Sequence, residues 1–191
     1  MLYWTMNKIK RIVLFFLSIF IVYLYTLPRY IPYLPTIPIY PNSLEESQEV
    51  EDSVKKRTRE DIDFFYKTDP SVSFGFIDIV PLSESELDSI ITTPFILILL
   101  HVLKYTINRP RPYQVNENID ILESKTGNTP AYPAGHALQA YYLAKKLSFQ
   151  YPDKREKLFE IAEKCNICRI KAGIHYKSDG EFSKRLVDLF L

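Results

Sequence analysis

The helix start at the centre of this sequence reads AYPAGHA, at residues 131–137. Proline suits the first turn of a helix, where the N–H that it lacks would have no partner, so Pro133 predicts an amphipathic helix from here to about residue 150. Gly135 lets a ligand approach the backbone closely, and the free N–H groups of a first helical turn attract anions. The stretch therefore predicts an anion site with a titratable side chain, His136, inside it.

Composition narrows the class of protein. The 191 residues, 47% of them hydrophobic, allow one domain with a sizeable core plus an appendage. The formal net charge of +1 provides no basic field, so we expect no nucleic-acid partner. Cys165 and Cys168 fall on the apolar stripe of a helix predicted over residues 153–172, and we expect them to be small core residues rather than a disulfide or zinc site.

The N-terminus has the pattern of a membrane anchor. A basic segment, residues 1–11, precedes the uncharged run of residues 12–27. At ~1.5 Å per residue this run gives about 24 Å of helix, slightly less than a ~30 Å hydrocarbon core. A cleaved signal peptide fits the same charges, but no small-x-small cleavage site follows; a buried soluble helix is a third interpretation. We expect an uncleaved single-pass anchor, with residues 1–11 in the cytoplasm and the rest of the chain on the lumenal or extracellular side.

A proline-rich linker, residues 28–43, follows the anchor. Its five prolines exclude helix and central strand and favour an extended, polyproline-like chain of ~3.1 Å per residue. Such a chain would hold the domain roughly 40 Å from the bilayer. The isoleucines and tyrosines of the linker leave a second interpretation open, in which it lies along the membrane or docks on the domain.

Residues 44–191 predict an all-α domain. Residues 44–66 are expected to form one charged helix, with the basic run of residues 55–59 as a solvated face. After a loop, a helix capped near Ser83 is interrupted at Thr93-Pro94, and the apolar run of residues 95–103, too short to span a bilayer, predicts a central core helix. Pro110 then ends this helix.

Two further groups of polar residues lie at predicted helix ends. Lys104, Arg109 and Arg111 cluster where the apolar helix ends. If a last helix begins near His175, then Asp179 lies four residues on and shares its face. A carboxylate there takes the proton of one ring nitrogen and leaves the other as a nucleophile or base.

Three fragments occur in order along the chain: Lys-x6-Arg-Pro, Pro-x-Gly-His and Arg-x5-His-x3-Asp. Their residues are Lys104 and Arg111, then Gly135 and His136, then Arg169, His175 and Asp179. Together they resemble the motifs of the type 2 phosphatidic acid phosphatase family, which shares its fold with the bacterial non-specific acid phosphatases and the vanadium haloperoxidases. The resemblance covers roughly residues 83–191 and implies an all-α helical bundle with its pocket at the helix ends.

The resemblance also implies roles. Phosphate would be bound by Lys104, Arg111, Gly135 and Arg169. His175 would attack phosphorus, Asp179 would orient it, and His136 would protonate the leaving group and then activate water. This chemistry uses no metal or other cofactor. The substrate would be a lipid phosphate or a small soluble phosphomonoester or diphosphate.

Two positions depart from the family pattern. Ala134 and Cys168 stand where the family usually has serine. Loss of one hydrogen bond to a charged phosphate, worth ~1.5–3 kcal/mol, predicts weakened rather than absent activity. Two other functions stay open: a vanadate-dependent peroxidase, in which vanadate is a prosthetic group instead of an inhibitor, and a non-catalytic phosphate- or lipid-binding module.

Overall fold

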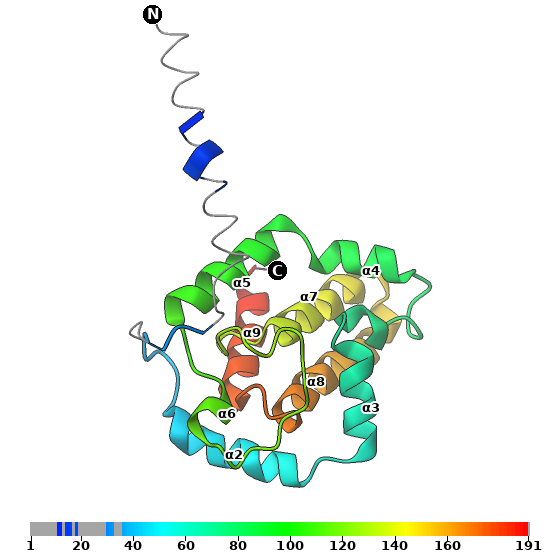
Figure 1. Ribbon diagram of the computed structural model, residues 1–191. Helices are drawn as coiled ribbons and strands as arrows, with labels where there is room; N and C mark the ends of the chain where they lie inside the picture. The colour runs from blue at the N-terminus through cyan, green and yellow to red at the C-terminus, as the bar shows by residue number, and fades with distance from the viewer. Residues whose placement is uncertain (1–10, 13, 17, 19–29, 33–35, 191) are drawn as a thin grey trace, which may run out of the picture.

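The computed structural model describes residues 11, 12, 14–16, 18, 30–32 and 36–190. All regular structure in these residues is helical, which confirms the predicted all-α class (Figure 1). The helices are α2 (Ser43–Lys55), α3 (Arg59–Thr68), α4 (Glu84–Ile91), α5 (Pro94–Ile107), α6 (Pro112–Val115), α7 (Gly135–Gln150), α8 (Arg155–Lys171) and α9 (Lys177–Phe190), with short 3-10 helices at Val72–Gly75 and Pro152–Lys154.

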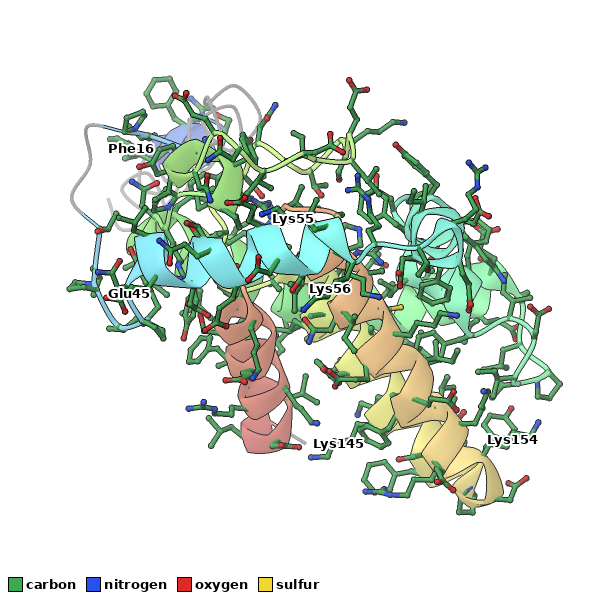
Figure 2. The ribbon with its side chains drawn as sticks, turned by 90° about the horizontal axis from the view of Figure 1, so that it is seen from below. Phe16, Glu45, Lys55, Lys56, Lys145 and Lys154 are labelled. Carbon is green, nitrogen blue, oxygen red and sulfur yellow. The ribbon has the colours of Figure 1, made fainter. Side chains whose placement is uncertain are left out.

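The bundle is built around α7, which packs against α8, α9 and α4. The face of α7 that carries Leu138, Tyr141 and Leu147 is buried, as its amphipathic pattern predicts. Cys165 and Cys168 of α8 are buried, as expected of small core residues, and form no disulfide in the structure. α2 crosses the bundle on the far side from α5, running in front of α8 and α9 when seen from below (Figure 2).

The helix predicted over residues 44–66 is two helices, so that prediction was wrong. The helix is interrupted before Thr58, which starts α3 with a capping box. The Thr58 side chain accepts the Asp61 N–H, and the Asp61 carboxylate accepts the Thr58 N–H. The basic run of residues 55–59 spans the turn between α2 and α3 and, apart from Arg57, it is exposed as expected. Within it the Arg57 side chain is only 10% exposed and donates to Asp120 and to the Lys171 carbonyl oxygen.

The start of α7 differs slightly from the prediction. α7 begins at Gly135 with Ala134 as its N-cap, so Pro133 precedes the helix instead of lying in its first turn, and the Tyr132–Pro133 peptide bond is cis. The Ala134 N–H donates to the Asp179 carbonyl oxygen at 3.3 Å. This bond connects the start of α7 to α9.

α5 is not the central core helix that its apolar run predicts. It buries Ile96 and Leu100, but Phe95, Ile98 and Val102 are 54%, 63% and 51% exposed. Figure 1 shows α5 at the edge of the bundle, on the side opposite α2. Because only one face of α5 meets the bundle, uniform hydrophobicity in the sequence overstated its burial.

In the described part of the chain, each helix taken alone is too short or too polar to cross a bilayer. One pair of helices, Glu84–Ile91 with Pro94–Val115, has the required length and composition but is bent by 52°. The predicted anchor at residues 12–27 lies mostly outside the described residues. Its described part is helical and exposes Leu14, Phe15 and Phe16.

The described part of the proline-rich linker docks on the domain. The Asn108 side chain, directly after α5, donates to the Ile31 carbonyl oxygen at 2.9 Å and accepts the Ile31 N–H at 3.4 Å. The Ile37 N–H donates to the Ile107 carbonyl oxygen at 3.2 Å. Of the two interpretations of the linker, docking therefore holds for these residues, and a 40 Å spacer does not.

Candidate active site

The three motifs meet at one cavity of about 170 Å³, between the C-terminal end of α5, the start of α7 and the turn before α9. Five of the seven predicted site residues line it: Lys104, Arg111, Gly135, His136 and His175. The rest of its lining comes from Leu97, Leu100, His101, Tyr105, Thr126, Thr129 and Gln139. Segments far apart in the sequence thus form one pocket at the helix ends.

His175 is held in one orientation by Asp179. Its Nδ1 lies 2.9 Å from Asp179 Oδ2, and both side chains are almost fully buried. A carboxylate accepts the Nδ1 proton, so in the neutral ring Nε2 carries the lone pair. Burial, and then the charges of Arg111 and Lys104, lower the pKa of His175 well below its ordinary value of 6.5. Near neutral pH, His175 therefore presents an unprotonated Nε2 to the cavity.

Arg111 faces this lone pair. One of its terminal nitrogens lies 2.8 Å from His175 Nε2 and donates to the Ile174 carbonyl oxygen at 2.6 Å. The other donates to the Thr129 hydroxyl, and Nε donates to the Thr129 carbonyl oxygen. Burial lowers the pKa of Arg111 to about 10, so it stays a cation at neutral pH. These contacts fix the plane of the guanidinium against the cavity.

Lys104 reaches the cavity from the last turn of α5. Its Nζ donates to the Pro130 carbonyl oxygen at 2.6 Å, and its side chain passes beside Gly135. Burial, followed by the nearby Arg111 charge, lowers the pKa of Lys104 well below 10.5. An anion in the cavity would oppose both effects and favour the charged amine, because opposite charges stabilise each other most in a buried site.

His136 lines the cavity from the first turn of α7. Its Nε2 lies 3.0 Å from the Asp69 carbonyl oxygen, which can only accept, so Nε2 carries the proton of the neutral ring. Burial, followed by the charge of Arg169, lowers the pKa of His136 to about 3. The ring is partly exposed, and solvent in the cavity screens part of this effect. His136 is thus neutral near pH 7 until an anion binds beside it.

Arg169 is the predicted phosphate ligand that does not line the cavity. Its guanidinium donates to the Thr68 carbonyl oxygen and to the Thr68 hydroxyl, both at 2.6 Å. Arg169 is 1% exposed, and among the described residues its Nε has no hydrogen-bond partner. Thr68 and Asp69, at the end of α3, therefore support both Arg169 and His136, a contribution that no sequence motif signalled.

A model of the PAP2 superfamily matches residues 87–184. The chain belongs to this superfamily. The match runs from α4 into α9 and contains all three motifs, so the predicted family is confirmed. The curated proteins, in contrast, include no match to the chain. Members of the PAP2 superfamily are generally phosphatases.

The two serines of the PAP2 pattern that are absent here have different consequences. Ala134 caps α7 without a side-chain hydrogen bond, so the hydroxyl is lost outright. At position 168, by contrast, the Cys168 sulfur accepts a hydrogen bond from Arg169 at 2.8 Å. A sulfur atom therefore still contacts the motif arginine, and the change at position 134 is the more important of the two.

Arg109 is a site residue that the PAP2 motifs do not include. Its guanidinium donates to Asp179 Oδ1 at 2.7 Å and to the Glu46 carboxylate at 2.6 Å, between the rings of Tyr40 and Tyr176. Glu46 lies in α2, outside the matched range, and also accepts from the Ser178 hydroxyl. The repeated Arg-Pro pair of residues 109–112 was the only sequence signal for this arrangement.

In the part of the chain that the structure describes, no three His, Cys, Asp or Glu side chains gather to form a metal-ion site. The expectation that the reaction needs no cofactor stays a prediction.

Proposed function

We propose that this PAP2 superfamily protein is a membrane-anchored phosphatase that hydrolyses a phosphomonoester through a phosphohistidine. The observation that carries the proposal is the orientation of His175. Asp179 holds its Nδ1, its Nε2 lone pair points to Arg111, and the cavity on that side is lined by Lys104 and Gly135. An aligned nitrogen nucleophile inside a cationic pocket is what attack on a phosphoryl group requires.

In the first step, His175 Nε2 forms a bond to phosphorus while the ester P–O bond breaks in line with it. Arg111 exchanges its contact with Nε2 for a phosphoryl oxygen, so that the lone pair becomes available as charge develops on the phosphate. Lys104 and the Gly135 N–H bind other phosphoryl oxygens. The resulting imidazolium is stabilised by Asp179, whose carboxylate is already bonded to Nδ1.

His136 transfers the protons. The leaving alkoxide takes a proton from His136, and in the second step neutral His136 removes a proton from the water that attacks phosphorus and releases His175. Because the pKa of His136 is low in the unliganded site, its proton has to enter with the substrate. A phosphomonoester monoanion brings that proton, and the negative charge raises the pKa of His136 on binding.

Substrate and location complete the proposal. The substrate is a lipid phosphate or a small soluble phosphomonoester or diphosphate, residues 12–27 anchor the chain, and the domain lies on the lumenal or extracellular side. If so, protease added to the cytosolic face of sealed vesicles leaves the domain intact. Digestion of the domain under those conditions would reverse the proposed topology.

The test of the chemistry is hydrolysis of an aryl phosphate by the full chain. Activity should disappear in His175→Ala, persist in EDTA and be inhibited by vanadate, which mimics the phosphoryl group. His101→Ala is the comparison variant, because His101 is an exposed histidine that also lines the cavity but lies outside the three motifs; its loss should leave hydrolysis in place. Equal activity of wild type and His175→Ala, or loss of activity in EDTA, would contradict the mechanism.

A phosphate-binding protein without turnover is the second candidate. It is favoured by Ala134, which removes the hydroxyl of the PAP2 pattern beside the cavity. Phosphate binding that protects the fold, with no hydrolysis by wild type and some by Ala134→Ser, would support this candidate.

A further inference from the structure

The exposed face of α5 is an apolar surface that the proposed chemistry does not use. Ile98 and Val102 are 63% and 51% exposed and lie on one side of the helix, together with Phe95. Residues 94–103 contain no Asp, Glu, Lys or Arg, and the one charged side chain of α5, Lys104, is buried at the cavity. A helix face without charge, bordering polar surface, is typical of a membrane or protein contact.

The course of the chain places this face near the predicted anchor. Ile31 is hydrogen-bonded to Asn108, at the C-terminal end of α5. Only four residue steps separate Ile31 from the end of the anchor at residue 27, and at most ~3.6 Å per residue these span about 14 Å. A chain anchored through residues 12–27 therefore holds the end of α5 close to the bilayer surface. In Figure 1 the described part of the N-terminal helix, in blue, lies beyond α5 and on the side away from α2.

Composition supports the same partner. Taken together, α4 and residues 94–115 have the length and hydropathy of a membrane span, but the 52° bend between them does not suit a straight span. A helix of 14 residues is about 21 Å long and fits along an interface better than across a ~30 Å core.

We propose that the exposed face of α5 lies in the bilayer interface, as a second membrane contact beside the anchor. This inference rests on the membrane anchoring within the proposed function and not on its chemistry. Leu97, His101 and Tyr105 of the same helix line the cavity, so this contact would set the cavity at the level of the lipid headgroups. The partner is the lipid surface itself. A second copy of the chain or another protein would also shield these side chains from water, but would not bring them into contact with lipid.

The test uses the full chain in phosphatidylcholine vesicles, with an environment-sensitive fluorophore on Ile98→Cys. The control is Ile167→Cys in α8, which is 40% exposed beside α2. The native cysteines are buried, and unsubstituted chain carried through the labelling gives their background. We expect the probe at position 98 to shift to shorter wavelength and lose most of its emission to lipids brominated near the headgroup. The probe at position 167 should do neither and should stay open to aqueous iodide.

Three results would overturn the inference: iodide quenching at position 98 equal to that at 167, shielding from iodide without quenching by brominated lipid, or a chain that does not float with vesicles. The second would indicate a protein partner or a second copy. None of these readouts depends on hydrolysis, so they test the membrane contact independently of the proposed phosphatase activity. Ile98→Glu combined with Val102→Glu should lower hydrolysis of a vesicle-borne phosphate severalfold while leaving that of a soluble aryl phosphate unchanged.

Discussion

At the scale of single residues, Gly135 shows how the site leaves room for a ligand. A Cβ at this position would lie 3.7 Å from Lys104 Cε and 3.9 Å from Leu100 Cδ1, which are ordinary contact distances. The protein can therefore accommodate a methyl group, and the backbone at Gly135 does not require glycine, since its φ is not positive. We propose that the glycine leaves room for a phosphoryl oxygen to approach its N–H.

Gly135→Ala tests whether the glycine is needed for phosphate binding or for the backbone conformation. We expect unfolding by urea to show unchanged stability or a gain of up to about 1 kcal/mol, because alanine loses less conformational entropy than glycine. kcat/KM should fall at least about tenfold, equivalent to ~1.4 kcal/mol of transition-state stabilisation. A stable variant with wild-type kcat/KM would show that phosphate does not bind at this N–H.

At position 134 we expect a substitution to raise activity instead of lowering it. Ala134→Ser supplies an N-cap oxygen that α7 lacks, so we expect about 1 kcal/mol of added stability in urea unfolding. The same hydroxyl can donate to phosphate, and kcat/KM should rise. Cys168→Ser is the matched control, with a smaller effect expected because the Cys168 sulfur already contacts Arg169. Higher stability without higher activity in Ala134→Ser would limit position 134 to capping.

At the scale of elements, α2 connects the N-terminal segment to the site. Glu46 of α2 pairs with Arg109, and Arg109 pairs with Asp179, which orients His175. Arg109 lines no part of the cavity, so we expect it to act as a positioning residue.

Arg109→Lys keeps the charge but cannot reproduce the two-sided contact of the guanidinium. One charge-assisted hydrogen bond is worth ~1.5–3 kcal/mol, so kcat should fall about tenfold or more while KM changes little. Glu46→Gln should show the same pattern, more weakly. Steady-state kinetics with an aryl phosphate measure this split; a rise in KM at constant kcat would instead place Arg109 in phosphate binding.

Helix ends were the elements that sequence predicted best. The capping serine at position 83 and the break at Thr93-Pro94 are both present, because each depends on local chemistry. The exposure of α5 was missed because it depends on what packs alongside. The division between α2 and α3 is local, set by the capping box of Thr58 and Asp61, but the charged run of residues 44–66 concealed it. Likewise the motifs located the cavity residues, whereas Glu46 and Thr68 join the site only through tertiary contacts.

At the scale of the whole molecule, the buried cationic site sets the response to pH. The pKa of His175 is lowered well below 6.5, so its Nε2 becomes protonated, and activity is lost, only as pH falls through that lowered value. The pKa of His136 is about 3, so its proton arrives with the substrate monoanion, which is depleted above the second phosphate pKa of about 6. We therefore expect kcat/KM to be highest at acidic pH. A rising limb centred above pH 6.5 would contradict this assignment.

The most direct measurement is of the covalent intermediate. Full-length protein is mixed with ³²P-labelled phosphomonoester and quenched in alkali, where phosphohistidine survives, and the labelled peptide is sequenced. We predict label on His175 in wild type and none in His175→Ala. With an aryl ester, whose leaving group departs without a proton, more label should accumulate in His136→Ala, where water is activated poorly. Hydrolysis by wild type with no label on His175 at any time, or equal labelling in His175→Ala, would contradict the account.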